Sequence, residues 1–259
     1  MANPKVFVGI PTLGSSDDAC YISVSMALTH YKGPSMLCPH GGKPIGHNRN
    51  MIVTKFLETD AEYLWFVDND CIIPINALEL LLEADKPIVS GLYPVLKLDR
   101  ELGMVFYFCA GNLNDDPDTQ HEGRFRMLER QPEGLTKVHM TGMGCCLIKR
   151  ELFEKTKFPW FQDFYFSANP KHHSHEDYYF YQQLHALDIY PYVDPRVVCG
   201  HIKKMDVTRL WRAAMRVREE ATEESAKDEK IVDVSEHDDL DSGKTLHSIG
   251  SGPVATPEE

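Results

Sequence analysis

Strand-like and helix-like segments alternate along about the first 95 residues of the chain. Short runs of β-branched and aromatic residues predict strands at residues 6–10, 35–38, 63–67 and 87–92. Capping residues and apolar positions at helical spacing predict helices at 19–31 and 48–58, and Pro74 is expected to open a third. This alternation predicts a doubly wound α/β half with a parallel sheet, in which ligands bind at the carboxyl ends of the strands.

The pattern changes after about residue 105. Shorter strand-like pieces at 105–147, interrupted by a polar stretch at 112–122, predict a mixed or antiparallel extension that carries a surface loop. A helix is expected at 176–187, a late strand at 196–202 and a partly docked helix at 207–224. Past residue 231 no apolar period persists. The chain is therefore predicted to comprise an α/β domain at 1–205, a C-terminal helix at 206–230 and a disordered acidic tail at 231–259.

Most of the negative charge lies at the C-terminal end. The net charge is −12, and residues 219–259 hold 13 acidic and 3 basic residues. The rest of the chain is therefore nearly neutral. Because the sequence shows no basic stripe, a nucleic acid stays open as a partner but is not favoured.

Hydropathy and cysteine spacing bear on the compartment. No apolar run approaches the ~20 residues that a membrane-spanning helix needs, and the first residues lack the pattern of a secretory signal. The 7 cysteines form no CxxC pair, and most lie in apolar runs, where a free cysteine behaves as a small hydrophobe. We therefore expect reduced thiols, no membrane span and a cytoplasmic location.

Two carboxylates, Asp68 and Asp70, directly follow the clearest buried strand of the chain. Spaced at i and i+2 after a strand, they can face the same crevice once the chain turns. Carboxylate oxygens suit Mg²⁺ or Mn²⁺, which keep open positions for water and substrate phosphates. The simpler alternative is a polar turn in which Asp70 caps the helix that follows.

Two further features are candidates for chemistry. Glu176 and Asp177 enter a predicted helix, where either carboxylate can serve as a general base or both can simply favour the helix dipole. His201 ends the predicted late strand, and a lone histidine is more often structural than a ligand. The order of these features along the chain raises the weight of the functional alternatives.

The combination resembles the GT-A glycosyltransferases, in particular the family-2-like and β-1,4-galactosyltransferase-like branches. Residues 64–70 (LWFVDND) resemble the DxD segment, and residues 141–153 (TGMGCCLIKRELF) resemble the glycine turn, strand and Arg-x-x-Phe step before the acceptor site. Residues 175–184 (HEDYYFYQQL) with 199–201 (CGH) resemble the Glu-Asp helix and the distal metal histidine. The resemblance covers roughly residues 5–203. It implies a GT-A-like catalytic domain with a Rossmann-like mixed sheet flanked by helices.

The resemblance also implies roles for individual residues. Asp70, Asp68 and His201 would hold Mn²⁺ or Mg²⁺. Asp177 would be the base of an inverting displacement, and Glu176 would bind acceptor hydroxyls. The residues expected to line the nucleotide-sugar site are Pro11, Thr12, Arg49, Asp68, Asn69 and Gly142. Arg49 belongs to a segment, residues 46–50 (GHNRN), that resembles a helix start of this family. A solvated arginine is an equally good expectation there.

The implied reaction moves one sugar from a nucleotide-diphosphate sugar to an acceptor hydroxyl. A retaining outcome, a nucleotidyltransferase and a non-catalytic nucleotide-sugar-binding protein remain as alternatives. Residues 38–42 (CPHGG) stand where many family-2 enzymes carry acidic residues that read uracil, so the base of the donor stays open. The Gln-x-x-Arg-Trp of processive synthases does not follow Asp177, which disfavours a polymerising enzyme. The acceptor is unknown.

Three histidines precede the Glu-Asp pair. His172, His173 and His175 offer three imidazoles within five residues, which fits either a second metal site or an exposed loop on the acceptor side, and the loop is the simpler expectation. The aromatic residues before them either stack on a sugar or belong to the core: Trp160, Phe161, Phe164, Tyr165 and Phe166.

Overall fold

The structure is a computed structural model of all 259 residues. It describes residues 3–14, 17–99, 103–114, 125–165 and 173–204, together with most positions between 206 and 222. The chain divides into two units, Met1–Lys204 and Met205–Glu259. Most of the predicted loop at 112–122 and the whole predicted tail at 231–259 lie outside the described residues.

A seven-stranded mixed sheet forms the centre of the first unit, with the strand order β10-β15-β5-β12-β3-β1-β2. The parallel part joins β1 (Val6–Thr12) to β2 (Ser35–Gly41) and β3 (Tyr63–Val67). β12 (Cys145–Lys149) runs antiparallel between β3 and β5 (Ile88–Leu92). β15 (Tyr192–Val198) is parallel to β5, and β10 (Thr136–Lys137) closes the far edge. The mixed α/β fold class predicted from the sequence is thereby confirmed.

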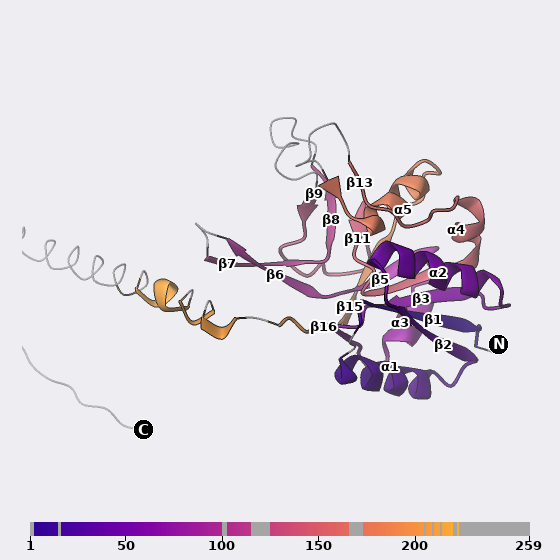
Figure 1. The fold of residues 1–259 in the computed structure, drawn as a ribbon, viewed down its shortest axis with the longest axis horizontal. Helices are drawn as coiled ribbons and strands as arrows, with labels where there is room; N and C mark the ends of the chain where they lie inside the picture. The colour runs from indigo at the N-terminus through magenta and orange to yellow at the C-terminus, as the bar shows by residue number, and fades with distance from the viewer. Residues whose placement is uncertain are drawn as a thin grey trace, which may run out of the picture. The chain divides into compact units, whose positions relative to one another are not determined.

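Two helical layers cover the sheet, one on each face (Figure 1). Along β1, Val6, Val8 and Ile10 belong to the core that includes helices α1 (Asp18–Tyr31) and α3 (Ala77–Glu83). Phe7 belongs to the opposite core, with α2 (Ile45–Leu57), α4 (Arg150–Lys155) and α5 (Glu176–His185). Successive side chains of a strand point to opposite faces, so a strand covered on both faces is apolar at nearly every position. This is why β1 and β3 show continuous apolar runs.

Several predicted boundaries were wrong. β2 continues through Pro39 to Gly41 because it is an edge strand, where a proline does not remove a needed hydrogen bond. The late strand begins at Tyr192 rather than 196 and holds Pro195 in a stretch where its register against β5 shifts. α2 begins at Ile45, three residues before the predicted start. α3 begins at Ala77, three residues after Pro74.

Short strands extend the carboxyl edge of the sheet. β4 (Cys71–Ile72) pairs with β16 (Gly200–His201), and β6 (Pro94–Asp99) pairs with β7 (Gly103–Phe108). β8 (Ala110–Leu113) lies between β9 (Phe125–Met127) and β11 (Met140–Thr141). β13 (Phe164–Tyr165) pairs with β14 (His173–Ser174) directly before α5. The antiparallel set β8, β9 and β11 lies within the extension predicted at 105–147, whereas the pairs β4–β16 and β13–β14 lie outside it and were not predicted.

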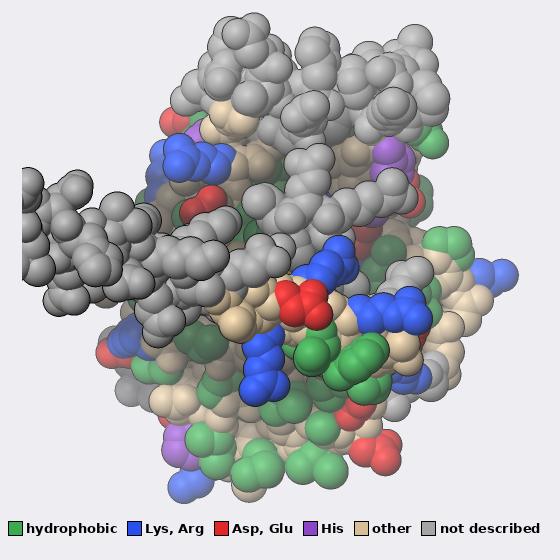
Figure 2. Space-filling model, turned by 90° about the vertical axis from the view of Figure 1, so that its left-hand side faces the viewer, with side chains coloured by type: hydrophobic (Ala, Val, Ile, Leu, Met, Phe, Trp, Pro, Cys, Tyr) green, Lys and Arg blue, Asp and Glu red, His purple; other side chains and the backbone are tan. Residues whose placement is uncertain are grey.

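In the second unit, the described residues from 207 to 219 are helical, and Val207 and Trp211 are exposed. The predicted domain boundaries remain predictions. No helix among the described residues is long and apolar enough to cross a membrane. In a space-filling view, acidic and basic side chains lie side by side on the face shown, without a continuous basic stripe among the residues described there (Figure 2).

Asn50 joins α2 to the segment that leads toward β13. Its Nδ2 donates to the carbonyl of Phe161 at 2.7 Å, and its Oδ1 accepts from the backbone N–H groups of Trp160 and Phe161. All three bonds are buried. A buried backbone group that loses its partner costs free energy.

We therefore expect Asn50→Ala to lower the free energy of unfolding by about 2–4 kcal/mol, since it removes three buried hydrogen bonds. Urea denaturation would measure the change. Asn76→Ala is the matched control, because Asn76 is exposed and its side chain makes no capping bond at the start of α3; it should stay within about 0.5 kcal/mol of wild type. An Asn50 variant as stable as this control would contradict the assigned role.

Candidate active site

The chain turns sharply after β3, and this turn positions the two predicted metal carboxylates. The N–H of Asp68 donates to the carbonyl of Gly144 at 3.1 Å, and the N–H of Cys71 donates to the carbonyl of Asp68 at 3.0 Å. Cys71 and Ile72 then form β4, in which Cys71 pairs with His201 of β16. This pairing places Asp70 beside His201, although the two residues are 131 positions apart in the sequence.

Asp70 and His201 present their polar atoms to each other. His201 Nε2 lies 3.4 Å from Asp70 Oδ2, while His201 Nδ1 lies 2.8 Å from the carbonyl of Pro94. A carbonyl only accepts, so Nδ1 carries the hydrogen. Nε2 donates to Asp70 only when the ring is protonated, and in the neutral ring it presents a lone pair that a cation can take. Lys203 Nζ donates to the same carboxylate oxygen at 2.9 Å. Burial acts to raise the pKa of Asp70, but the hydrogen bonds from His201 and Lys203 outweigh it and lower that pKa to about 2.

Arg49 lies between the turn and α5 and contacts a carboxylate on each side. Its Nη2 donates to Asp68 Oδ1 at 2.7 Å, and its Nε donates to Glu176 Oε1 at 3.1 Å. Its guanidinium also lies over the Phe66 ring, at 5.2 Å from the centroid. Burial acts to lower the pKa of Arg49, but the charges of Asp68 and Glu176 outweigh it and hold that pKa above its ordinary value.

Arg49 is only 3% exposed, so the expectation of a solvated arginine at the start of α2 was wrong. Its ion pairs in the described part of the chain are with Asp68 and Glu176, and its Nη1 is buried there without a hydrogen-bond partner. A direct contact of Arg49 with a nucleotide remains a prediction. Asp68 likewise points one oxygen at Arg49 rather than at Asp70 and His201, and its metal contact remains a prediction.

Asp177 occupies the first turn of α5 beside the buried Glu176. Burial of its carboxyl and the charge of Glu176 raise the pKa of Asp177 to about 7, although Arg49 and the N–H of Tyr178 act in the opposite direction. That N–H donates to Asp177 Oδ1 at 2.8 Å. A carboxyl whose pKa lies near neutrality suits proton transfer at physiological pH.

Tyr93 connects the Asp70–His201 side of the site to the glycine turn before β12. Its ring packs edge-on against His201 with 4.9 Å between centroids. A Cβ atom at Gly142 would lie 2.0 Å from the Tyr93 hydroxyl, and one at Gly144 would lie 2.7 Å from the Tyr93 ring. Tyr93 therefore supplies a packing reason for both glycines, and the predicted contact of Gly142 with a sugar is untested.

The carboxyl end of β1 carries Pro11 and Thr12. The Asn48 side chain donates to the carbonyls of Thr12 and Lys43, at 3.0 and 2.7 Å, and fixes this strand end to the start of α2. Asn69 follows in the turn after β3, and its carbonyl accepts from the N–H of Asp17 at 3.3 Å. The structure thus places Pro11, Thr12 and Asn69 at strand ends, but their predicted contacts with a nucleotide are untested.

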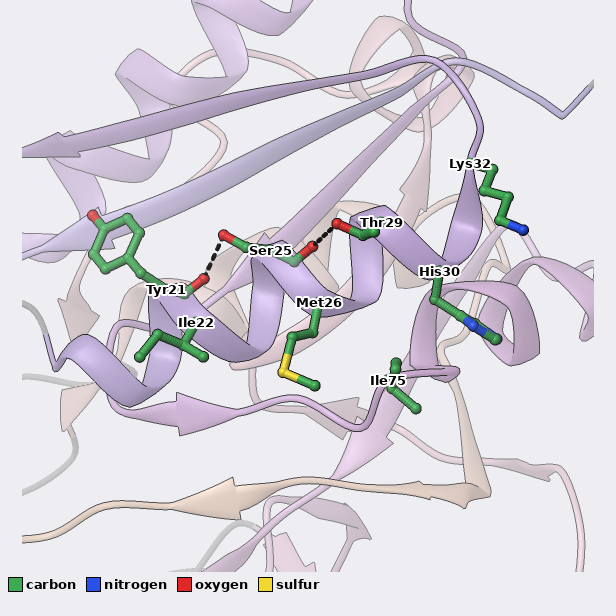
Figure 3. Close-up of a pocket in the computed structure, with 8 residues that line it drawn as sticks. All are labelled: Tyr21, Ile22, Ser25, Met26, Thr29, His30, Lys32 and Ile75. Atoms are coloured by element: carbon green, nitrogen blue, oxygen red, sulfur yellow. Dashed lines mark hydrogen bonds between the residues drawn. The ribbon is translucent and has the colours of Figure 1, made fainter.

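A groove of about 640 Å³ runs along the outer side of α1 (Figure 3). The residues that line it are different from those of the candidate site. Ile22, Met26 and Ile75 contribute apolar surface to it. The hydroxyls of Ser25 and Thr29 donate to carbonyls of their own helix. No carboxylate is among the described residues that line the groove, so these residues offer no ligand for a metal-bound diphosphate.

Sequence reasoning missed three residues of the site: Tyr93, Pro94 and Lys203. Tyr93 and Pro94 directly follow the buried strand β5, so their position at the carboxyl edge of the sheet was a usable signal. Lys203 follows His201 by two residues and gave no pattern of its own. The carbonyl of Pro94 that orients His201 is a backbone group, which a sequence does not reveal.

Comparisons with known proteins support the fold. No protein-family model and no curated protein matches the sequence. Among solved structures, GalNAc-T7 with UDP, GalNAc and Mn²⁺ is similar at a TM-score of 0.53 and 13% identity; the match covers 78% of this chain and 44% of that one. The chain thus spans less than half of GalNAc-T7. At this identity the match shows a shared fold, so the molecule has a GT-A-like fold.

Two other solved structures match this chain with lower TM-scores. A197 from STIV gives a TM-score of 0.49 at 20% identity, covering 77% of this chain and 86% of that one. The inositol-1-phosphate CTP transferase from T. maritima gives a TM-score of 0.40 at 11% identity, covering 85% and 98%. Both scores are too low to carry an argument about function.

The raised pKa of Asp177 predicts a change in stability with pH. In the folded chain the carboxyl binds a proton more tightly than in the unfolded chain, whose pKa is near 3.8. The resulting stabilisation is complete below about pH 3.8 and is lost as the pH rises through about 7. Asp177→Asn has no proton to lose, so relative to wild type it should gain stability as the pH rises, by at least about 1 kcal/mol.

Urea denaturation at pH 5.5 and 8.5, with metals chelated, would measure this difference. Asp18→Asn is the control, since Asp18 is an exposed carboxylate in the first turn of α1. The control should differ from wild type by the same amount at both pH values. An equally flat difference for Asp177→Asn would show that its carboxyl titrates like a solvated one.

Proposed function

We propose that this chain is a metal-dependent glycosyltransferase that moves one sugar from a nucleotide-diphosphate sugar to an acceptor hydroxyl. The observation that carries the proposal is the pairing of Asp70 with His201 at the carboxyl edge of a GT-A-like sheet. The position of GalNAc-T7, solved with UDP, GalNAc and Mn²⁺, among the structures of similar fold supports it. The sequence resemblance described above points to the same class.

The residues present fit a divalent cation. Asp70 offers carboxylate oxygen, and His201 offers Nε2, because its Nδ1 is held by the carbonyl of Pro94. A histidine whose second ring nitrogen donates to a carbonyl is the usual arrangement at a metal. Bound Mn²⁺ or Mg²⁺ would neutralise the charge that builds on the diphosphate as the sugar–phosphate bond breaks. Lys203, which shares the Asp70 carboxylate, adds positive charge on the same side.

The acceptor side is assigned to α5. Asp177 takes the proton of the acceptor hydroxyl as this oxygen attacks the sugar, which gives inversion by in-line displacement. Glu176, held by Arg49, orients acceptor hydroxyls. Arg49 positions both carboxylates rather than reacting itself, since it contacts Asp68 on the donor side and Glu176 on the acceptor side.

The first experiment is a screen of nucleotide sugars for Mn²⁺-dependent hydrolysis, with UDP-sugars first. Nucleoside triphosphates with sugar phosphates belong in the same screen, because release of pyrophosphate from them would mark a nucleotidyltransferase. Binding of a nucleotide sugar without any turnover would mark a non-catalytic binding protein. Either outcome would overturn the proposal.

On the donor found, Asp177→Asn should lower kcat by ~10²–10⁴-fold while donor binding survives, because general-base catalysis contributes about that much. Glu176→Gln retains an oxygen that accepts from Arg49, so its effect should be milder and fall mainly on acceptor KM. Steady-state turnover and donor binding of both variants are the measurements. Near wild-type turnover of Asp177→Asn beside an inactive Glu176→Gln would reverse the two assignments, and two active variants would rule out this mechanism.

A further inference from the structure

The two-stranded ribbon before α5 gathers polar side chains on one of its faces. The register pairs Phe164 with Ser174 and Tyr165 with His173. The next pair outward along this antiparallel register is Asp163 with His175. Residues directly opposite each other in such a ribbon have side chains on the same face, a few ångströms apart.

Burial confirms this alternation. Asp163, Tyr165, His173 and His175 are exposed, whereas Ser174 on the other face is buried. The Tyr165 and His173 rings lie 5.2 Å apart between centroids, as do the His173 and His175 rings. The exposed face therefore carries a carboxylate opposite an imidazole at the end nearest α5.

Glu176 completes a group of three at this point. One ligand atom from each of Asp163, His175 and Glu176 lies within 4.8 Å of the other two. The side chain of Glu176 is fixed rather than mobile, since it is 6% exposed and its Oε1 accepts from Arg49. A rigid carboxylate next to an exposed imidazole and a second carboxylate is a ligand set of the kind that holds a transition metal.

We propose that Asp163, His175 and Glu176 bind a zinc ion, at a site separate from the pair formed by Asp70 and His201. One imidazole nitrogen and two carboxylate oxygens match the ligands that Zn²⁺ accepts, with water or the neighbouring His173 available for a fourth position. The site differs from the cluster of His172, His173 and His175 considered from the sequence. Two of its ligands are carboxylates, Asp163 directly before β13 and Glu176 at the start of α5. Glu176 is also the residue proposed to orient acceptor hydroxyls, but zinc binding is measured without sugar transfer, so the two proposals can fail separately.

The ion would join two separate parts of the fold, the start of β13 and the junction of β14 with α5. Asp163 precedes β13, His175 follows β14 and Glu176 begins α5, so a shared ligand shell fastens the ribbon to the helix. Glu176 is in turn bound to Arg49 of α2. A ligand that binds the folded chain but not the unfolded chain raises the stability of the fold, so zinc should stabilise the protein.

The test is calorimetric titration of metal-stripped full-length protein with Zn²⁺ alone, followed by thermal unfolding with and without the ion. Asp163→Asn and His175→Gln change exposed side chains and keep similar shapes, and circular dichroism would verify their folding. Each should weaken zinc binding by at least about 10-fold and abolish the rise in melting temperature. Mutation of residues that only hydrogen-bond to the ligands of a metal commonly lowers metal affinity about 10-fold or more. Asp163 and His175 are proposed as ligands themselves, so their effect should be at least as large.

Two further variants separate this site from other zinc contacts. Asp70→Ala should still bind zinc at this site, since Asp70 belongs to the pair with His201. His30→Gln should also keep it, because His30 of α1 faces a single carboxylate, Glu79, at 2.9 Å. Wild-type zinc affinity in Asp163→Asn and His175→Gln would overturn the proposal, as would loss of the zinc site in Asp70→Ala or the absence of zinc binding in the wild type.

Discussion

The buried guanidinium of Arg49 is the interaction on which the candidate site depends. It contacts Asp68 after β3 and Glu176 at the start of α5, and both carboxylates lose much of their hydration there. A buried ion pair contributes little net stability, but removal of one partner leaves an uncompensated charge. Arginine suits this place better than lysine because its planar fork presents donors to two carboxylates at once. The geometry of Asp68 and of Glu176 is thus set by one side chain of α2.

The site thus has two halves, and Arg49 contacts a carboxylate on each side. Asp70, His201 and Lys203 lie on one side, held together by the pairing of β4 with β16. Asp177 lies on the other side, in the first turn of α5, and its carboxyl is affected by the charges of both Glu176 and Arg49. Because both halves are built on the ends of regular elements, their groups keep fixed positions before any ligand binds. Such preorganisation is what the proposed transfer requires.

The sequence predicted the local features of this site well and its long-range contacts poorly. Asp68 and Asp70 were recognisable because they follow an uninterrupted buried strand, and Glu176 and Asp177 because they start a helix. The burial of Arg49 was not predictable, since its partner Glu176 is 127 positions away and no local pattern records that contact. The same holds for Asp163, whose neighbour His175 is fixed only by the register of β13 and β14. The fold class was predictable because strands covered on both faces leave continuous apolar runs, whereas strand ends at Pro39 and Pro195 depended on the edge position and on a register shift.

The proposed transfer requires that Asp70 and His201 bind a divalent cation that in turn holds a nucleoside diphosphate. Calorimetric titration of the protein with a panel of nucleoside diphosphates, in Mn²⁺ and then in EDTA, tests it most directly. EDTA should abolish the binding, and Asp70→Ala and His201→Ala should each weaken it at least about 10-fold. Glu79→Ala, which removes an exposed carboxylate paired with His30, should bind like wild type. Undiminished affinity in EDTA, or in either site variant, would contradict the account.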